Sequence, residues 1–148
     1  MKTKNKIFFE KIIYFFLKFL FKKENLIIKR NQLFWDIDIS EAIDLHLFIF
    51  GSFEKEISLT AKNLKLDRKK CILDIGANFG VQSLQFAKNF SDSLIYSIEP
   101  TNFAYEKMLK NINLNPKIKN NIFPYQLFFG TEGTKLPYKI YSSWNLDK

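Results

Sequence analysis

The sequence predicts an α/β fold with a short parallel sheet, and three observations support this prediction. Apolar runs at 71–75 and 94–98 are rich in Ile and Leu and too short for helices. A glycine-containing turn at 76–80 and an amphipathic run at 81–90 separate them. The second run ends on an acid, Glu99, which proline follows. This order of strand, glycine turn, helix, strand and acid is typical of a Rossmann-like nucleotide-binding βαβ unit.

The residue types in this unit suit a nucleotide ligand. Glycine has no Cβ, so the backbone at Gly76 and Gly80 can turn sharply and approach a ligand closely. We expect the N–H groups after Gly76 to point into the crevice at the carboxyl ends of the strands. Glu99 follows Gly76 by 23 positions, close to the roughly 20 found in dinucleotide-binding folds. Its carboxylate can accept hydrogen bonds from both hydroxyls of a ribose.

The remaining elements follow in chain order. A helix is expected over 6–23, then a connector or strand over 26–34 and a helix over 41–50 with Ser40 as N-cap and Gly51 as its end. Three further elements complete the expectation. A helix follows Ser52, another spans 103–113 after a cap at Thr101 or Asn102, and a third strand spans 121–129, where Pro124 favours an edge position. Cys71 and His46 are expected to be packed structural residues.

The glycine pattern decides between cofactor classes. Positions 76, 78 and 81 are Gly, Asn and Val, so the G-x-G-x-x-G pattern of nicotinamide and flavin folds is absent and an NAD-dependent oxidoreductase is disfavoured. The pattern present is D-x-G-x-N-x-G, which resembles the first motif of class I S-adenosylmethionine-dependent methyltransferases. The longer string from Leu73 to Gly80, with Ser97-Ile98-Glu99-Pro100, is similar to the FkbM family of methyltransferases. The resemblance runs from about residue 44 to the C-terminus.

The resemblance implies a function and a set of site residues. It implies S-adenosylmethionine as cofactor and O-methylation of a hydroxyl on a sugar or natural product, hence a small-molecule or glycan acceptor. The cofactor-binding residues that it implies are Asp74, Gly76, Asn78, Gly80 and Glu99. Gly76 and Gly80 would lie at the methionine end, Asp74 would position the turn or the ammonium, and Glu99 would bind the ribose. No catalytic base is assigned, and no metal site is predicted because the acids do not cluster with histidine.

The domain organisation suggests an incomplete enzyme. We expect residues 1–35 to form a helix and connector, and residues 36–148 to form a partial methyltransferase domain of about three strands. The later strands of the complete fold are not expected in this sequence, so the 71–75 strand would leave an open edge, which invites pairing with a complementing chain or oligomer. The alternative function is a non-catalytic membrane-associated or interaction module that carries a relic Rossmann half.

The positive charge lies in the N-terminal segment. Residues 1–30 hold nine Lys and Arg and two Glu, a net charge of +7, whereas the other 118 residues carry +1 of the total of +8. A broad nucleic-acid-binding face on the main domain is therefore not expected, and no nucleic-acid partner is predicted.

The expected helix over 6–23 has a narrow polar stripe and a much wider apolar surface. Lys11, Tyr14, Lys18 and Lys22 form one narrow polar stripe, and Phe, Ile and Leu make up most of the remaining surface. The longest apolar run, at 12–17, is too short for a transmembrane span. Glu10, Lys11 and Lys18 interrupt the wider apolar region and no A-x-A cleavage site follows, so a signal peptide is not indicated. Two placements stay open in a cytoplasmic protein: peripheral contact with the inner membrane face, or packing as an arm on the domain or a partner subunit.

Overall fold

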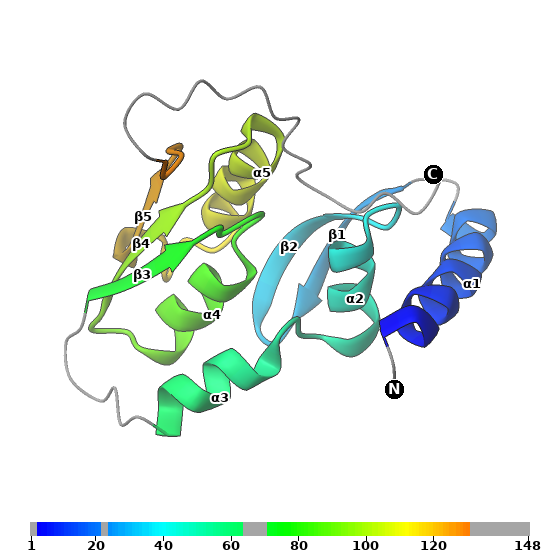
Figure 1. The fold of residues 1–148 in the computed structure, drawn as a ribbon, viewed down its shortest axis with the longest axis horizontal. Coiled ribbons are helices and arrows are strands. Elements are labelled where there is room, and N and C mark those ends of the chain that lie inside the picture. The colour runs from blue at the N-terminus through cyan, green and yellow to red at the C-terminus, as the bar shows by residue number, and fades with distance from the viewer. Residues whose placement is uncertain (1–2, 22–23, 64–70, 131–148) are drawn as a thin grey trace. The chain divides into compact units, whose positions relative to one another are not determined.

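The computed structural model describes residues 3–21, 24–63 and 71–130, and these belong to two compact units (Figure 1). Unit 1 is built on the residues up to Phe53, and unit 2 begins at Glu54. This division differs from the predicted boundary between residues 35 and 36. That boundary falls within a strand whose pairing and packing belong wholly to unit 1.

Unit 1 contains a hairpin between two helices. Its elements are α1 (Thr3–Phe21), β1 (Asn25–Arg30), β2 (Leu33–Asp38) and α2 (Ala42–Phe50). The strands pair antiparallel, so the predicted connector over 26–34 is in fact one strand and the start of the next. Asn31 and Gln32 link them with positive φ values of 50° and 65°, as a two-residue hairpin turn of type I′ requires.

The core of unit 1 follows from the alternation of side chains along β2. Leu33, Trp35 and Ile37 are buried on one face, and α2 packs against this strand with Leu45 and Leu47 also buried. Burying these large apolar side chains provides the main stabilisation of the unit, because each contributes about 1.5–3 kcal/mol.

The ends of α2 test two sequence predictions. The N-cap residue is Glu41, so the prediction of Ser40 is wrong. The backbone N–H and the Oγ of Ser40 instead donate to Asp38 Oδ1, at 2.9 and 2.6 Å. The prediction for the other end is confirmed, because Gly51 has φ 73° and donates its N–H to the carbonyl oxygen of Leu47 at 2.8 Å.

Unit 2 has the predicted α/β fold. Its elements are α3 (Lys55–Asn63), β3 (Cys71–Ile75), α4 (Val81–Asn89), β4 (Leu94–Ile98), α5 (Asn102–Asn113), a short 3-10 helix (Lys119–Asn121) and β5 (Ile122–Tyr125). The three strands are parallel in the order β3-β4-β5, with α4 and α5 as crossover helices, which is a Rossmann-like arrangement. β5 is an edge strand, as Pro124 indicated, although it ends before residue 129.

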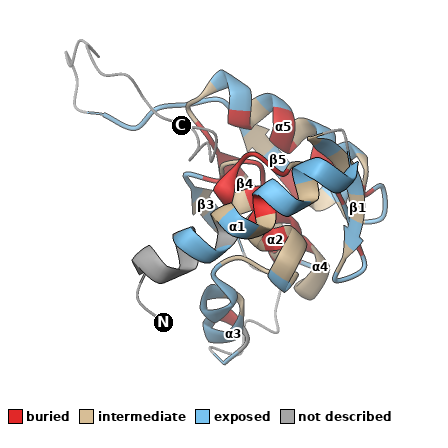
Figure 2. Cartoon of the chain, turned by 90° about the vertical axis from the view of Figure 1, so that its right-hand side faces the viewer, coloured by how far each residue is buried: buried red, intermediate tan, exposed pale blue. Residues whose placement is uncertain are grey.

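Helices lie on one face of the sheet in unit 2, whereas side chains on the other face are exposed. Register partners in a parallel sheet share a face, so Asp74 and Ser97 project to the same side, where α4 and α5 lie (Figure 1). β4 is the most buried of the three strands (Figure 2). On the other face Leu73 is 55% exposed and Ile75 61%. Cys71 is also exposed as a free thiol, so the prediction of a core residue is wrong: β3 is an edge strand of the described sheet.

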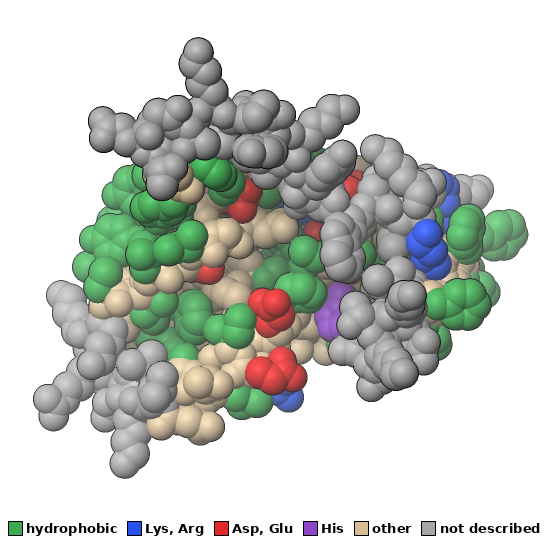
Figure 3. All heavy atoms as spheres, viewed as in Figure 1, with side chains coloured by type: hydrophobic (Ala, Val, Ile, Leu, Met, Phe, Trp, Pro, Cys, Tyr) green, Lys and Arg blue, Asp and Glu red, His purple; other side chains and the backbone are tan. Residues whose placement is uncertain are grey.

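Aromatic side chains continue this uncovered face across β4 and β5. The ring of Tyr96 stacks on those of Phe123 and Tyr125, with centroids 5.3 and 6.2 Å apart. Apolar side chains gather over the sheet in the space-filling view (Figure 3). Parallel sheets are normally covered on both faces. The described part of the sheet therefore presents an apolar surface suited to further cover.

Candidate functional site

The turn after β3 is built from residues with left-handed backbone conformations. Gly76, Asn78 and Gly80 have φ values of 79°, 50° and 90°. The N–H groups of Gly76 and Ala77 both donate to the carbonyl oxygen of Ile98, at 2.8 and 2.9 Å. The expectation that the N–H groups after Gly76 point into the crevice is therefore wrong at Ala77, because the end of β4 accepts its hydrogen bond.

Glu99 connects this turn to the start of α5. Its Oε2 accepts a hydrogen bond from the Asn78 N–H at 2.9 Å. Its Oε1 accepts from the N–H and the Oγ1 of Thr101, at 2.9 and 2.6 Å. The residue is buried, with 6% of its surface exposed. The two halves of the predicted motif thus meet in space at the carboxyl ends of neighbouring strands, as their spacing indicated.

Asp74 lies on the helix-covered face of β3. Its Oδ2 accepts a hydrogen bond from Ser83 Oγ of α4 at 2.5 Å, and Ser97 Oγ of β4 donates to the same hydroxyl at 2.7 Å. Burial raises the pKa of Asp74, because desolvation outweighs the hydrogen bond from Ser83. This chain of polar groups joins β3, α4 and β4, so Asp74 fixes the helix that follows the turn.

The two glycines of the turn have different surroundings. Among the described residues, a Cβ at Gly76 would meet no heavy atom within 4 Å, so the backbone there borders open space in this part of the structure. A Cβ at Gly80 would lie 3.0 Å from Leu84 Cδ1 and 3.0 Å from Met108 Cγ. Gly76 can therefore admit a ligand close to the backbone, whereas Gly80 allows α4 and α5 to pack closely.

Several supporting residues were not predicted from sequence. Ser83 donates to Asp74, Thr101 donates to Glu99, and Ser97 donates to the hydroxyl of Ser83. Asn111 of α5 donates its side-chain amide to the Phe79 carbonyl oxygen at 3.0 Å. One signal for Ser97 is available in the sequence, namely a hydroxyl within an otherwise apolar strand. The others depend on which helix faces cover the sheet.

Other candidate residues do not join this turn. The His46 ring contacts those of Phe50 and Phe53, with centroids 4.6 and 5.6 Å away, so it is packed in unit 1 as predicted. Within residues 3–21, 24–63 and 71–130, no group of three or more His, Cys, Asp or Glu could hold a metal ion.

Comparisons with known proteins give likeness to solved structures only. No family model and no curated protein matches the chain. TYW2 from M. jannaschii, solved in complex with AdoMet, is 23% identical with a TM-score of 0.47, over 69% of this chain and 42% of that one. Trm5b from Pyrococcus abyssi is 19% identical with a TM-score of 0.45, over 69% of this chain and 28% of that one. TYW2 from P. horikoshii, solved with MeSAdo, is 16% identical with a TM-score of 0.46, over 71% of this chain and 36% of that one. The chain spans less than half the length of each.

Proposed function

We propose that unit 2 binds S-adenosylmethionine and acts in a methyltransferase of the FkbM type, with a hydroxyl on a sugar or natural product as acceptor. The observation that carries the proposal is the hydrogen bond from the Asn78 N–H to Glu99 Oε2. It joins the D-I-G-A-N-F-G turn to the Glu-Pro pair at the carboxyl ends of adjacent parallel strands, where ligands of open α/β sheets bind.

The residues of the turn fit different parts of the cofactor. Each carboxylate oxygen can accept about two hydrogen bonds, so Glu99 Oε2 has capacity beyond its bond to Asn78 and can accept from a ribose hydroxyl. The open space at Gly76 suits the methionine end. The hydrogen bond to Ser83 supports the turn-positioning role of Asp74, rather than direct contact with the ammonium.

The chemistry asks little of the protein beyond positioning. The bound cofactor supplies a methyl group that its sulfonium already activates. The protein would hold the acceptor oxygen in line with that carbon, which is a large contribution to the rate. The edge strand β3, with Leu73 and Ile75 exposed in the described sheet, suits pairing with a complementing chain or another copy.

A calorimetric titration of the full chain with S-adenosylmethionine tests the proposal. We expect saturable binding by the wild type, weakened about tenfold by Glu99→Gln, which keeps one acceptor oxygen for the turn but removes the charge. Gly76→Ala should weaken binding similarly because its Cβ enters the open space. The matched control is Gly51→Ala, which has a similar left-handed conformation in unit 1 and should bind like the wild type. A folded wild type that binds no cofactor would overturn the proposal.

The second candidate is a non-catalytic interaction module that retains only the half-fold. The exposed apolar residues of the sheet, including Leu73 and Tyr125, favour it because such surfaces usually contact a partner. The same titration separates the two candidates, since a module of this kind need not bind the cofactor. In either case we propose that the chain has no nucleic-acid partner, because the net charge outside residues 1–30 is only +1. The proposed location is the cytoplasm.

A further inference from the structure

α1 packs against its own unit through Tyr14, at the centre of its polar stripe. Tyr14 is fully buried, and its hydroxyl donates to Glu24 Oε1 at 3.0 Å. Lys18 Nζ donates to the same hydroxyl and forms an ion pair with Glu24, each at 3.0 Å. The Phe21 ring meets that of Phe48 on α2 edge to face, 6.4 Å between centroids. These contacts orient the helix on its own unit.

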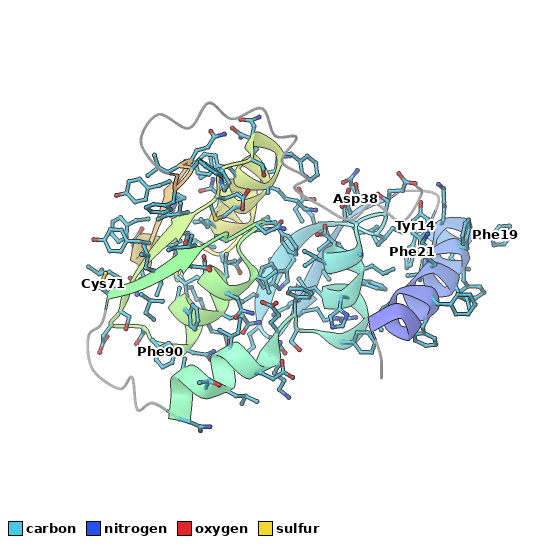
Figure 4. The ribbon with its side chains drawn as sticks, viewed as in Figure 1. Tyr14, Phe19, Phe21, Asp38, Cys71 and Phe90 are labelled. Atoms are coloured by element: carbon cyan, nitrogen blue, oxygen red, sulfur yellow. The ribbon has the colours of Figure 1, made fainter. Side chains whose placement is uncertain are left out.

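The opposite side of α1 is apolar and exposed. Phe8, Ile12, Phe15 and Phe19 recur at spacings of four, three and four, which places them in one row on a helix, with Phe16 and Leu20 beside them. We call these six residues the phenylalanine face. Phe19 is 83% exposed and Phe16 64%. Tyr14 and Phe19 point to opposite sides of the helix (Figure 4).

This orientation is the reverse of that of a helix covering a soluble core. An amphipathic surface helix normally turns its apolar stripe inward, and a soluble monomer seldom exposes a large contiguous apolar patch. No described helix is long and apolar enough to cross a membrane. The face therefore fits an occupant that lies along α1.

We propose that the phenylalanine face inserts into the surface of a bilayer that contains anionic lipids. Charge complementarity selects this occupant, because residues 1–30 carry a net charge of +7. An interfacial helix gains both from apolar burial and from attraction of lysines to anionic headgroups. Pairing α1 with α1 of a second copy would instead bring two such positive segments together, which is unfavourable.

The test is flotation of the full chain with vesicles, at low and high salt. We expect binding to vesicles of phosphatidylglycerol and phosphatidylcholine, weak binding to phosphatidylcholine alone, and loss of binding at high salt as charges are screened. Phe16→Gln/Phe19→Gln should lower the partition coefficient by about tenfold or more. Gln is a good helix former, and neither ring packs inside unit 1, so α1 should stay folded.

Controls make each outcome decisive. Ile27→Gln changes a residue of β1 that is 66% exposed and lies outside the phenylalanine face, so vesicle binding should be unchanged. Should the double variant unfold by circular dichroism, Phe19→Gln alone gives the same comparison at the most exposed ring. The proposal is overturned if the wild type does not bind anionic vesicles, or if the variants bind as the wild type does. A dimer that the double variant dissociates, without lipid binding, would assign the face to a second copy.

Discussion

Substitution of the two turn glycines with alanine should separate close packing from backbone strain. Gly76 and Gly80 both have left-handed φ values, 79° and 90°, so alanine at either position costs about 1–2 kcal/mol from backbone strain. The gain from a less flexible unfolded chain is common to both variants. The surroundings differ, since a Cβ at Gly76 meets nothing and a Cβ at Gly80 meets Leu84 and Met108 at 3.0 Å.

The packing term at Gly80 can be estimated from its neighbours. Leu84 and Met108 are fully buried, so neither side chain can move aside into solvent. Overpacking of a core typically costs about 1–3 kcal/mol. We therefore expect Gly80→Ala to lower the free energy of unfolding by about 2–5 kcal/mol and Gly76→Ala by about 1–2 kcal/mol.

Urea unfolding followed by far-UV circular dichroism measures this difference. Both glycines lie in unit 2, so the two variants report on the same unit. Met108→Ala provides a further check, because removing that side chain makes room for a Cβ at position 80. Met108→Ala alone should be destabilising by about 2–5 kcal/mol, and the double variant should lose less stability than the two single losses combined. Equal losses for Gly80→Ala and Gly76→Ala would refute the assigned packing role.

Two further predictions concern buried polar groups. Burial raises the pKa of Asp74, so the folded chain keeps this carboxyl protonated to a higher pH than the unfolded chain does. The protonated carboxyl therefore contributes its full stabilisation below the ordinary pKa of 3.8, and this stabilisation is lost as the pH rises through the pKa of the folded chain. Asp74→Asn should remove this pH dependence and keep or raise stability at neutral pH, as urea unfolding across the acidic range will show; an unchanged profile would contradict it. Tyr14→Phe removes the hydroxyl that donates to Glu24 and should lower the free energy of unfolding by about 0.5–1.5 kcal/mol. Denaturant titrations measure this change, and a smaller loss would mean that this hydrogen bond does not hold α1.

The sheet of unit 2 could be predicted because its strand signals are local. The apolar runs at 71–75 and 94–98 are bounded by turn residues and by proline, and the structure gives β3 and β4 these same bounds. The hairpin of unit 1 lacks such a signal. Its turn uses Asn31 and Gln32 without glycine, so the sequence over 26–34 carries no local signal that divides it into two strands.

The meeting of the turn with Glu99 was predictable from the sequence, but the surrounding hydrogen bonds were not. The interval from Gly76 to Glu99 indicated that the turn and the acid meet, and the hydrogen bond from the Asn78 N–H confirms it. The spacing did not indicate that Thr101 would occupy the other carboxylate oxygen. Alternation along β3 places Asp74 and Leu73 on opposite faces, yet which face the helices cover is a tertiary property.

The same limit explains why α1 could not be oriented from its sequence. Helical periodicity defines a polar stripe at Tyr14 and Lys18 and an apolar remainder, but it does not say which of them faces the protein. Glu24 decides the orientation, because it lies beyond the helix and offers Tyr14 and Lys18 a half-buried acceptor. With Tyr14 held inward, the phenylalanine face on the opposite side is left exposed and favours an apolar environment, which water does not supply. The charge of the segment then favours lipid over a second copy of the chain.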